Sequence, residues 1–189
     1  MKKFAKLGSL ALAIALICAL LTGCGDGVSL KDVQKKGKIT IATSPDFPPF
    51  ESLSGGEIVG IEVDIVKLIA EKLGVEPVFE QMDFDSVLPG VQTGKFDVGM
   101  SGITVTEKRR KNADFTDPYF LAAQSIVVLS DSDITCKADL EGKTVSVQTG
   151  TTAEEYCTEN GYTVMAYQAN NDACTALTSG KVDAWVVDN

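Results

Sequence analysis

Hydrophobic and polar residues alternate along the chain with two periods, and these predict strands and helices in regular succession. Residues 38–43 alternate like a strand, whereas apolar residues between Gly60 and Gly74 recur at the spacing of an amphipathic helix. Strand patterns follow at 75–81 and 96–100. Between them we expect a second helix with Ser86 as its N-cap, which puts Pro89 in the first turn. This β-α-β-α-β order predicts a parallel sheet with helices on both faces.

The pattern changes after this first unit and then starts again. Residues 124–130 form an apolar strand pattern with no helix before it, which suits a crossing from one lobe to another. Strand patterns then alternate with helix patterns, with strands at 143–148, 163–167 and 182–187 and helices from 153 and over 172–178. The last strand runs into Asp188 with no helix to cover its end, so we expect the C-terminal part of the second lobe to be missing.

Candidate ligand-binding residues follow the carboxyl ends of the predicted strands, where parallel sheets bind their ligands. The turn and charged segment at 99–110 combines backbone N–H groups, the hydroxyls of Ser101 and Thr104, and Arg109. Arginine binds a carboxylate through two hydrogen bonds and stays charged at working pH. The alternative is a plain strand-to-helix turn, with Thr106 as N-cap and the cations at 108–111 on a solvated face.

The second unit offers complementary groups. The segment 150–152 (Gly-Thr-Thr) precedes a predicted helix, where free N–H groups favour an anion, and Asp188 ends the last strand. Each feature alone also fits helix capping or an ordinary strand end. Together they could bind both charges of a free α-amino acid, with Phe47 and Phe84 on either side of its side chain.

Composition excludes several classes of function. The formal net charge is -9, from 17 basic and 26 acidic residues, which argues against a nucleic-acid partner. The chain has no histidine, so Ser-His and Cys-His nucleophile pairs and histidine metal ligands are excluded. Cys136, Cys157 and Cys174 show no zinc-site spacing; one disulfide with a free thiol and three buried thiols remain open. We expect no cofactor, no metal and no catalytic residue.

The N-terminus has the pattern of an export signal. Three lysines precede an apolar run at 7–21, which is too short to cross a membrane, and the run ends in Leu21-Thr22-Gly23-Cys24. That tetrad resembles the bacterial lipobox, in which the cysteine is lipidated. We therefore predict a signal peptide at 1–23, a lipidated Cys24 with a tether to residue 37, and a protein anchored outside the cytoplasmic membrane.

Residues 37–189 resemble the extracellular solute-binding proteins (family 3) of polar amino-acid ABC transporters. The resemblance depends on these motifs in combination: Pro48-Pro49-Phe50, Gly60-Ile61-Glu62-Val63-Asp64, Asp83-Phe84-Asp85 with Leu88-Pro89, Gly94-Lys95-Phe96-Asp97, Ile103-Thr104-Val105-Thr106-Glu107-Lys108-Arg109, Phe115-Thr116-Asp117-Pro118-Tyr119, Gly150-Thr151-Thr152 and Gly180-Lys181-Val182-Asp183-Ala184. It implies an α/β fold of two parallel-sheet lobes joined by hinge strands, a periplasmic-binding-protein-like fold of type II. The lobes would span 38–121 and 131–189, with the hinge at 122–130.

The resemblance also implies roles for individual residues. Arg109 would bind the α-carboxylate, assisted by Gly102, Thr104 and Thr152, and Asp188 would bind the α-ammonium. The side chain would lie between Phe47 and Phe84, with its far end at Ser44 and Gln148. Cationic binders of this family often carry an acid where Ser44 stands, so we expect a polar, uncharged ligand side chain. Where some relatives have a serine, Gly102 can contribute only its backbone.

The implied function is capture of a free amino acid by hinge closure and delivery to an ABC permease, without catalysis. Two alternatives remain open. One is an enzyme on the same fold, such as a periplasmic cyclohexadienyl (prephenate/arogenate) dehydratase, which needs a general acid in the cleft. The other is the ligand-sensing domain of a receptor, which predicts a transmembrane segment after Asn189. The predicted lipid anchor argues against the receptor, because a second anchor would be redundant.

Overall fold

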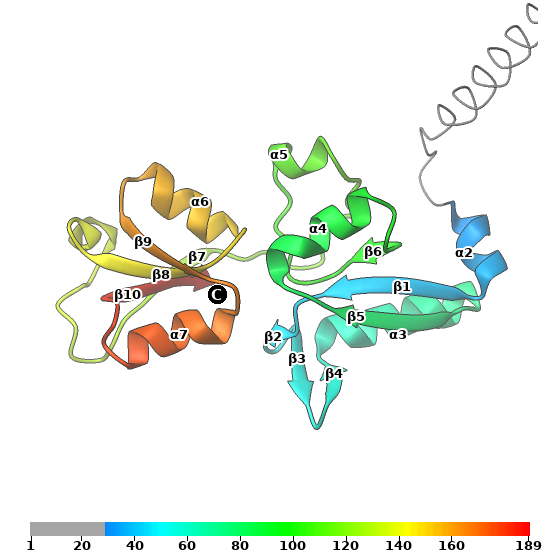
Figure 1. Cartoon of the computed structure of the whole chain (residues 1–189), viewed down its shortest axis with the longest axis horizontal. Helices are drawn as coiled ribbons and strands as arrows, with labels where there is room; N and C mark the ends of the chain where they lie inside the picture. Colours follow the sequence, from blue (N-terminus) through cyan, green and yellow to red (C-terminus); the bar gives the residue numbers. More distant parts are fainter. Residues whose placement is uncertain (1–28) are drawn as a thin grey trace, which may run out of the picture.

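The computed structural model describes residues 29–189, which form two α/β lobes joined by an irregular segment (Figure 1). The predicted signal peptide and Cys24 lie outside these residues. The helices are α2 (Leu30–Lys36), α3 (Ile61–Leu73), α4 (Phe84–Gln92), α5 (Glu107–Arg110), α6 (Thr152–Glu159) and α7 (Asn170–Thr178). The strands are β1 (Lys38–Thr43), β2 (Asp46–Phe47), β3 (Glu51–Ser54), β4 (Glu57–Val59), β5 (Glu76–Gln81), β6 (Val98–Gly99), β7 (Gln124–Val127), β8 (Thr144–Gln148), β9 (Thr163–Tyr167) and β10 (Ala184–Asp188).

The N-terminal lobe, residues 29–110, is built on a parallel sheet in the order β5-β1-β6. Side chains of β1 alternate between its two faces, as the sequence pattern predicts. Ile39 and Ile41 pack with Val66 of α3, whereas Ala42 packs with Val87 of α4 on the other face. This layering confirms the predicted parallel sheet with helices on both sides.

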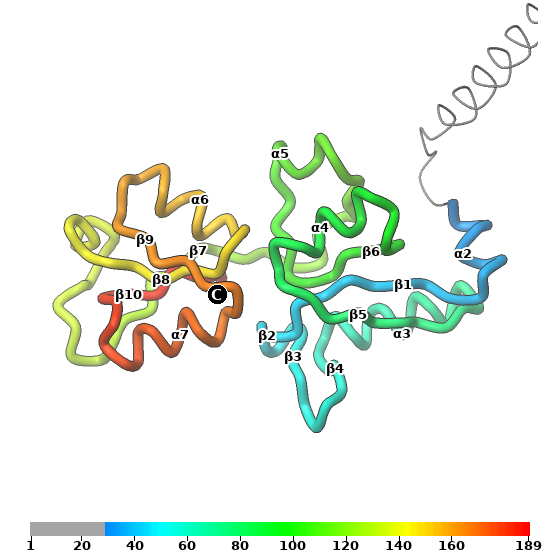
Figure 2. Tube along the Cα trace, viewed as in Figure 1, coloured from blue at the N-terminus to red at the C-terminus, as the bar shows by residue number. Residues whose placement is uncertain are grey.

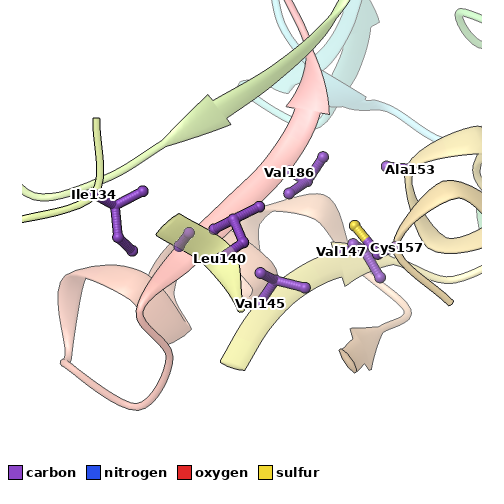
Figure 3. Packing of buried hydrophobic residues seen from close by; sticks show 8 residues of the cluster. Ile134, Leu140, Val145, Val147, Ala153, Cys157 and Val186 are labelled. Atoms are coloured by element: carbon purple, nitrogen blue, oxygen red, sulfur yellow. The ribbon is translucent and has the colours of Figure 1, made fainter. Parts of the chain in front are cut away.

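The C-terminal lobe, residues 124–189, is built on a sheet in the order β7-β10-β8-β9, in which only β7 runs antiparallel. Val145 and Val147 of β8 pack against Cys157 of α6 and Leu140 of a short 3-10 helix (Figure 3). On the opposite face, Leu177 of α7 packs with Trp185 of β10. The lobe therefore has a core on each side of its sheet.

Three local predictions were wrong. Helix α4 begins at Phe84 after Asp83 as N-cap, so Pro89 lies inside the helix and not in its first turn. The apolar pattern at 124–130 gives a strand only over Gln124–Val127, and this strand belongs to the edge of the C-terminal sheet, with Ile126 packed on that lobe's core. The chain instead crosses between the lobes in the irregular residues 111–123, which we call the crossing segment (Figure 2).

A small antiparallel sheet, β2-β3-β4, was not predicted. Its hairpin turns at Gly55 and Gly56, whose φ angles of 62° and 88° are those of a tight two-residue turn. In Figure 1 the hairpin extends away from the parallel sheet of the N-terminal lobe. Strand β2 pairs with β3 and thereby fixes the direction of the side chains that follow β1.

Among residues 29–189, no helix combines the length and the apolar composition that a membrane crossing requires. The three cysteines in this part of the chain are free thiols, and Cys157 alone is buried.

Candidate functional site

A cleft lies between the two lobes, at the carboxyl ends of the strands of both sheets. Its empty space is about 460 Å³, counting the part open to solvent. Its wall includes eight of the nine predicted ligand residues: Phe47, Phe84, Gly102, Thr104, Arg109, Gln148, Thr152 and Asp188. The ninth, Ser44, is buried and donates its hydroxyl to Asp46 instead of facing this cleft (3.3 Å).

Arg109 is held at the meeting point of the two lobes. Thr106 caps α5 by accepting a hydrogen bond from the Arg109 backbone N–H (3.2 Å), as the sequence predicts. The guanidinium donates to the carbonyl of Thr104 (2.7 Å) and to that of Gly150 in the other lobe (3.0 Å). It also lies 5.8 Å from the ring centre of Phe84, within cation–π range.

The charge on Arg109 is kept despite its burial. Burial lowers the pKa of Arg109, while the carboxylates of Glu155 and Asp188 oppose that effect. An arginine pKa is high enough that the side chain stays cationic. The cleft therefore offers a fixed positive charge with planar donors, the arrangement that a carboxylate prefers.

Asp188 provides the opposite charge at the end of β10. Its carboxylate accepts hydrogen bonds from the hydroxyl of Thr104 (3.4 Å) and from the side-chain amide of Gln124. Burial raises the pKa of Asp188, and the contacts with Thr104, Arg109 and Gln124 oppose the shift. Gln124 also donates to Thr152 (3.1 Å), so it links two of the three predicted ligand residues of the C-terminal lobe.

The N-terminus of α6 points backbone N–H groups toward the same region. Thr151 caps the helix, accepting from the N–H of Glu154 (3.2 Å) and donating to the carbonyl of Gln148 (2.7 Å). Both Thr151 and Thr152 line the cleft. The helix dipole therefore adds partial positive charge near Arg109.

Asp46 is a cleft residue that the sequence interpretation missed. It accepts hydrogen bonds from the backbone N–H of Asn170 (2.6 Å) and the side-chain amide of Gln148 (3.2 Å), both across the cleft in the C-terminal lobe. Burial raises the pKa of Asp46, partly offset by these bonds and by Ser44. An acidic side chain therefore lines the cleft two residues after Ser44.

The missed residues differ in how well the sequence could have revealed them. The Gly55-Gly56 pair signals a hairpin, and pairing β2 with β3 would have placed Asp46 at the cleft beside Phe47. Glu51 also lines the cleft, at the start of β3. No sequence pattern marks Gln124 as a cleft residue. Its contacts with Thr152 and Asp188 depend on how the crossing segment joins the C-terminal sheet.

Comparison with known proteins places the chain in a family. Residues 39–179 match the family model of bacterial extracellular solute-binding proteins, family 3. The arginine-binding extracellular protein ArtP of Bacillus subtilis (strain 168) is 36% identical over 184 residues, covering 95% of this chain and 72% of that protein.

Two solved structures are also similar. The arginine-bound form of truncated ArgBP from T. maritima superposes with a TM-score of 0.81 at 44% identity, covering 84% of this chain and 77% of that one. The ancestral amino acid-binding protein AncCDT-1, a precursor of cyclohexadienyl dehydratase, gives a TM-score of 0.82 at 36% identity, covering 85% and 74%. With the family model matching most of the sequence and both lobes present, the chain belongs to the bacterial extracellular solute-binding proteins of family 3.

Proposed function

We propose that this chain is the substrate-binding component of an ABC importer and captures a free α-amino acid between its two lobes. The observation that carries the proposal is the pairing of Arg109 and Asp188 on the wall of one cleft, where Thr104 is hydrogen-bonded to both. An α-carboxylate at Arg109 and an α-ammonium at Asp188 would satisfy the two charges that every free amino acid carries. The α6 N-terminus would add N–H donors for the carboxylate.

We further propose that the ligand's side chain is cationic. The sequence alone favoured an uncharged polar side chain, because Ser44 is not an acid, and neither ArtP nor ArgBP supports that preference. Asp46 supports the opposite choice, since its carboxylate lines the cleft beside Phe47. A guanidinium bound there would offset the unfavourable burial of the Asp46 charge. ArtP and ArgBP, whose names specify arginine, are consistent with this ligand class.

Capture would be completed by closure of the lobes over the ligand, followed by docking on a membrane permease. Contacts between the lobes support such a closed form. Arg109 reaches Gly150, and Lys108 forms an ion pair with Glu155 (3.0 Å). Delivery needs no chemistry in this chain, so we propose that it is not an enzyme. Absence of prephenate and arogenate turnover would distinguish it from a dehydratase on the same fold.

Arginine and citrulline provide the sharpest test, because they share a shape and differ in the charge of the side chain. Calorimetry should show arginine binding at least about tenfold more tightly than citrulline, equivalent to about 1.4 kcal/mol. Asp46→Asn keeps an acceptor oxygen for Asn170 and removes the charge. It should weaken arginine binding by a similar factor and change citrulline binding by less than about threefold.

The outcomes separate the two parts of the proposal. If arginine and citrulline bind with equal affinity to the unaltered chain, the proposal of a cationic ligand side chain is wrong, whereas the proposal of an amino-acid site still stands. If none of the twenty amino acids raises the melting temperature, the proposed function is wrong, since a bound ligand stabilises by about RT ln(1 + [L]/Kd).

We also propose that Cys24 anchors the protein to the outer face of the cytoplasmic membrane through lipid. The lipobox-like tetrad at 21–24 supports this. In cells, Cys24→Ala should move the protein from the membrane fraction to the soluble fraction. Cys136→Ala, which removes an exposed thiol, should leave the distribution unchanged.

A further inference from the structure

Two buried glutamates meet where the hairpin joins α3. Glu51 begins β3 and is 1% exposed, and Glu62 lies in the first turn of α3 and is 2% exposed. The strand and the helix are held together by the backbone, because the N–H of Glu62 donates to the carbonyl of Phe50 (3.0 Å). Gly60 permits this close approach, since a Cβ there would lie 2.1 Å from the Phe50 oxygen.

The two carboxyls contact both the cleft and the crossing segment. Glu62 Oε1 accepts hydrogen bonds from the backbone N–H of Gly102 (2.9 Å) and from the hydroxyl of Tyr119 in the crossing segment. Glu51 Oε1 accepts from the hydroxyl of Ser101 (3.0 Å). Ser101 and Gly102 form the turn after β6 that lines the cleft. The pair therefore joins a ligand-binding turn to the segment between the lobes.

The second oxygen of each carboxyl indicates how the pair is charged. Oε2 of Glu51 and Oε2 of Glu62 are both buried without a donor among residues 29–189. Two unpaired, charged carboxylates side by side would carry a large desolvation penalty and repel each other. A single proton held between the two groups removes one of the two charges and their repulsion, and it gives the oxygens a hydrogen bond.

Neighbouring groups strengthen this conclusion. The titratable groups acting on Glu51 from the adjoining elements are Glu62 of α3 and Asp46 of β2, both acidic, and the Ser101–Gly102 turn has none. Tyr119 faces the pair from the crossing segment, and burial followed by contact with Glu62 raises the pKa of Tyr119, so it donates as a neutral phenol. Arg109 does not neutralise the pair, because its guanidinium is bonded to the Thr104 and Gly150 carbonyls.

We propose that Glu51 and Glu62 share one proton and act as a positioning pair, which fixes the Ser101–Gly102 turn of the cleft relative to Tyr119 of the crossing segment. The proton resides on Glu51. Glu62 accepts two hydrogen bonds and lies at the N-terminus of α3, where the helix dipole favours the remaining negative charge of the pair. The positioning role rests on the proposed amino-acid site, whereas the shared proton does not.

A shared proton makes stability depend on pH in a definite direction. Burial, followed by the charge of Glu62, raises the pKa of Glu51 from 4.5 to about 10. Between these two values the folded protein binds one more proton than the unfolded chain. Stability must therefore fall as pH rises through this interval, in contrast to an acid whose pKa is lowered by folding.

The shared proton is tested on the full chain without ligand. The melting temperature should fall from about pH 6 to about pH 9, and it should fall less in Glu51→Gln, which carries a permanent donor and cannot ionise. Glu57→Gln is the matched control, because it removes one exposed carboxylate from the same hairpin, and it should follow the unaltered chain. Equal pH profiles for the two variants would overturn the proposal.

Infrared spectroscopy gives a second, independent answer that holds even if Glu51→Gln does not fold. The unaltered chain should show the carbonyl stretching band of a protonated carboxyl that persists to about pH 9. If every carboxyl is ionised at that pH, no proton is shared.

Tyr119→Phe tests positioning, because Tyr119 does not line the cleft and half of it is exposed. Removing its hydroxyl should weaken arginine binding by about threefold to tenfold, while the protonated-carboxyl band remains. Tyr162→Phe is the control, since its hydroxyl donates to Lys137 in the C-terminal lobe, and arginine affinity should not change. Unchanged affinity in Tyr119→Phe would refute the positioning role. If the unaltered chain binds no amino acid, the proposed function is wrong, and the melting profiles and the infrared band still decide the shared proton.

Discussion

Among the cations of α5, Arg109 alone lines the cleft and lies near an aromatic ring, and, like Lys108, it also reaches the other lobe. We expect Arg109→Ala to weaken binding of every α-amino acid alike, by about a hundredfold or more. The reason is that an arginine–carboxylate contact has two charge-assisted hydrogen bonds of roughly 1.5–3 kcal/mol each. Calorimetry with several amino acids measures the loss.

Arg110→Ala is the matched control, because Arg110 is the next residue and is exposed. It should leave the affinity unchanged. If the loss of affinity in Arg109→Ala differs from one amino acid to another, Arg109 contacts the ligand's side chain and not its α-carboxylate. If Arg109→Ala binds amino acids as tightly as the unaltered chain, Arg109 does not belong to the binding site.

At the scale of single residues, prediction succeeded where a side chain follows directly from a strand end. Asp188 terminates β10, so topology alone predicts that it lies at the cleft, whereas Gln148 at the end of β8 was expected there only from the family resemblance. Ser44 and Asp46 lie in a loop with no period of its own. Which of the two faces the cleft depends on pairing with β3, and the hydrophobic pattern did not contain that information.

Whole elements were predicted best where hydrophobic periodicity was strong. Strands β1 and β9 have the predicted bounds. Helix α4 starts earlier than predicted because the backbone of Asp83 takes the extended cap conformation, and proline inside the helix is tolerated there. The residue at which a helix begins depends on tertiary packing, which the local sequence does not determine.

The two ends of α3 provide an element-scale prediction. Gly60 has a φ of 141° and leaves no room for a Cβ, whereas Gly74 has a φ of 68° and open space around it. Gly74→Ala should cost only the strain of a left-handed residue, about 1 kcal/mol. Gly60→Ala must also separate β3 from α3, and it should cost at least about 1–3 kcal/mol more.

Urea denaturation of both variants measures this difference. Equal losses of the free energy of unfolding would mean that the junction of hairpin and helix relaxes freely. Because Glu51 and Glu62 meet at that junction, Gly60→Ala should also diminish the protonated-carboxyl band, and Gly74→Ala should not.

On the scale of the whole molecule, the sequence predicted two lobes with their ligand loops on facing edges, but not how closely they approach. That distance is determined by the crossing segment, whose irregular residues have no hydrophobic period. In the structure the lobes touch at several points, where Arg109 reaches Gly150, Asp46 bonds to Asn170 and Lys108 pairs with Glu155. The exposed Lys108–Glu155 pair contributes little, because solvent screens it. Close van der Waals packing between the lobes depends more strictly on the distance between them than this ion pair does. Such packing occurs at Gly150.

Gly150 lies against Asp85 of the other lobe, and a Cβ at Gly150 would be 2.8 Å from the Cβ of Asp85. Gly150→Ala should therefore hold the lobes apart and weaken arginine binding by about tenfold or more, since overpacking costs roughly 1–3 kcal/mol. Gly161→Ala has a similar φ, 74° against 80°, with open space around it, so it controls for backbone strain. Small-angle scattering should show ligand-induced compaction in Gly161→Ala and less in Gly150→Ala. Undiminished binding in Gly150→Ala would mean that capture does not require the lobes to close this far.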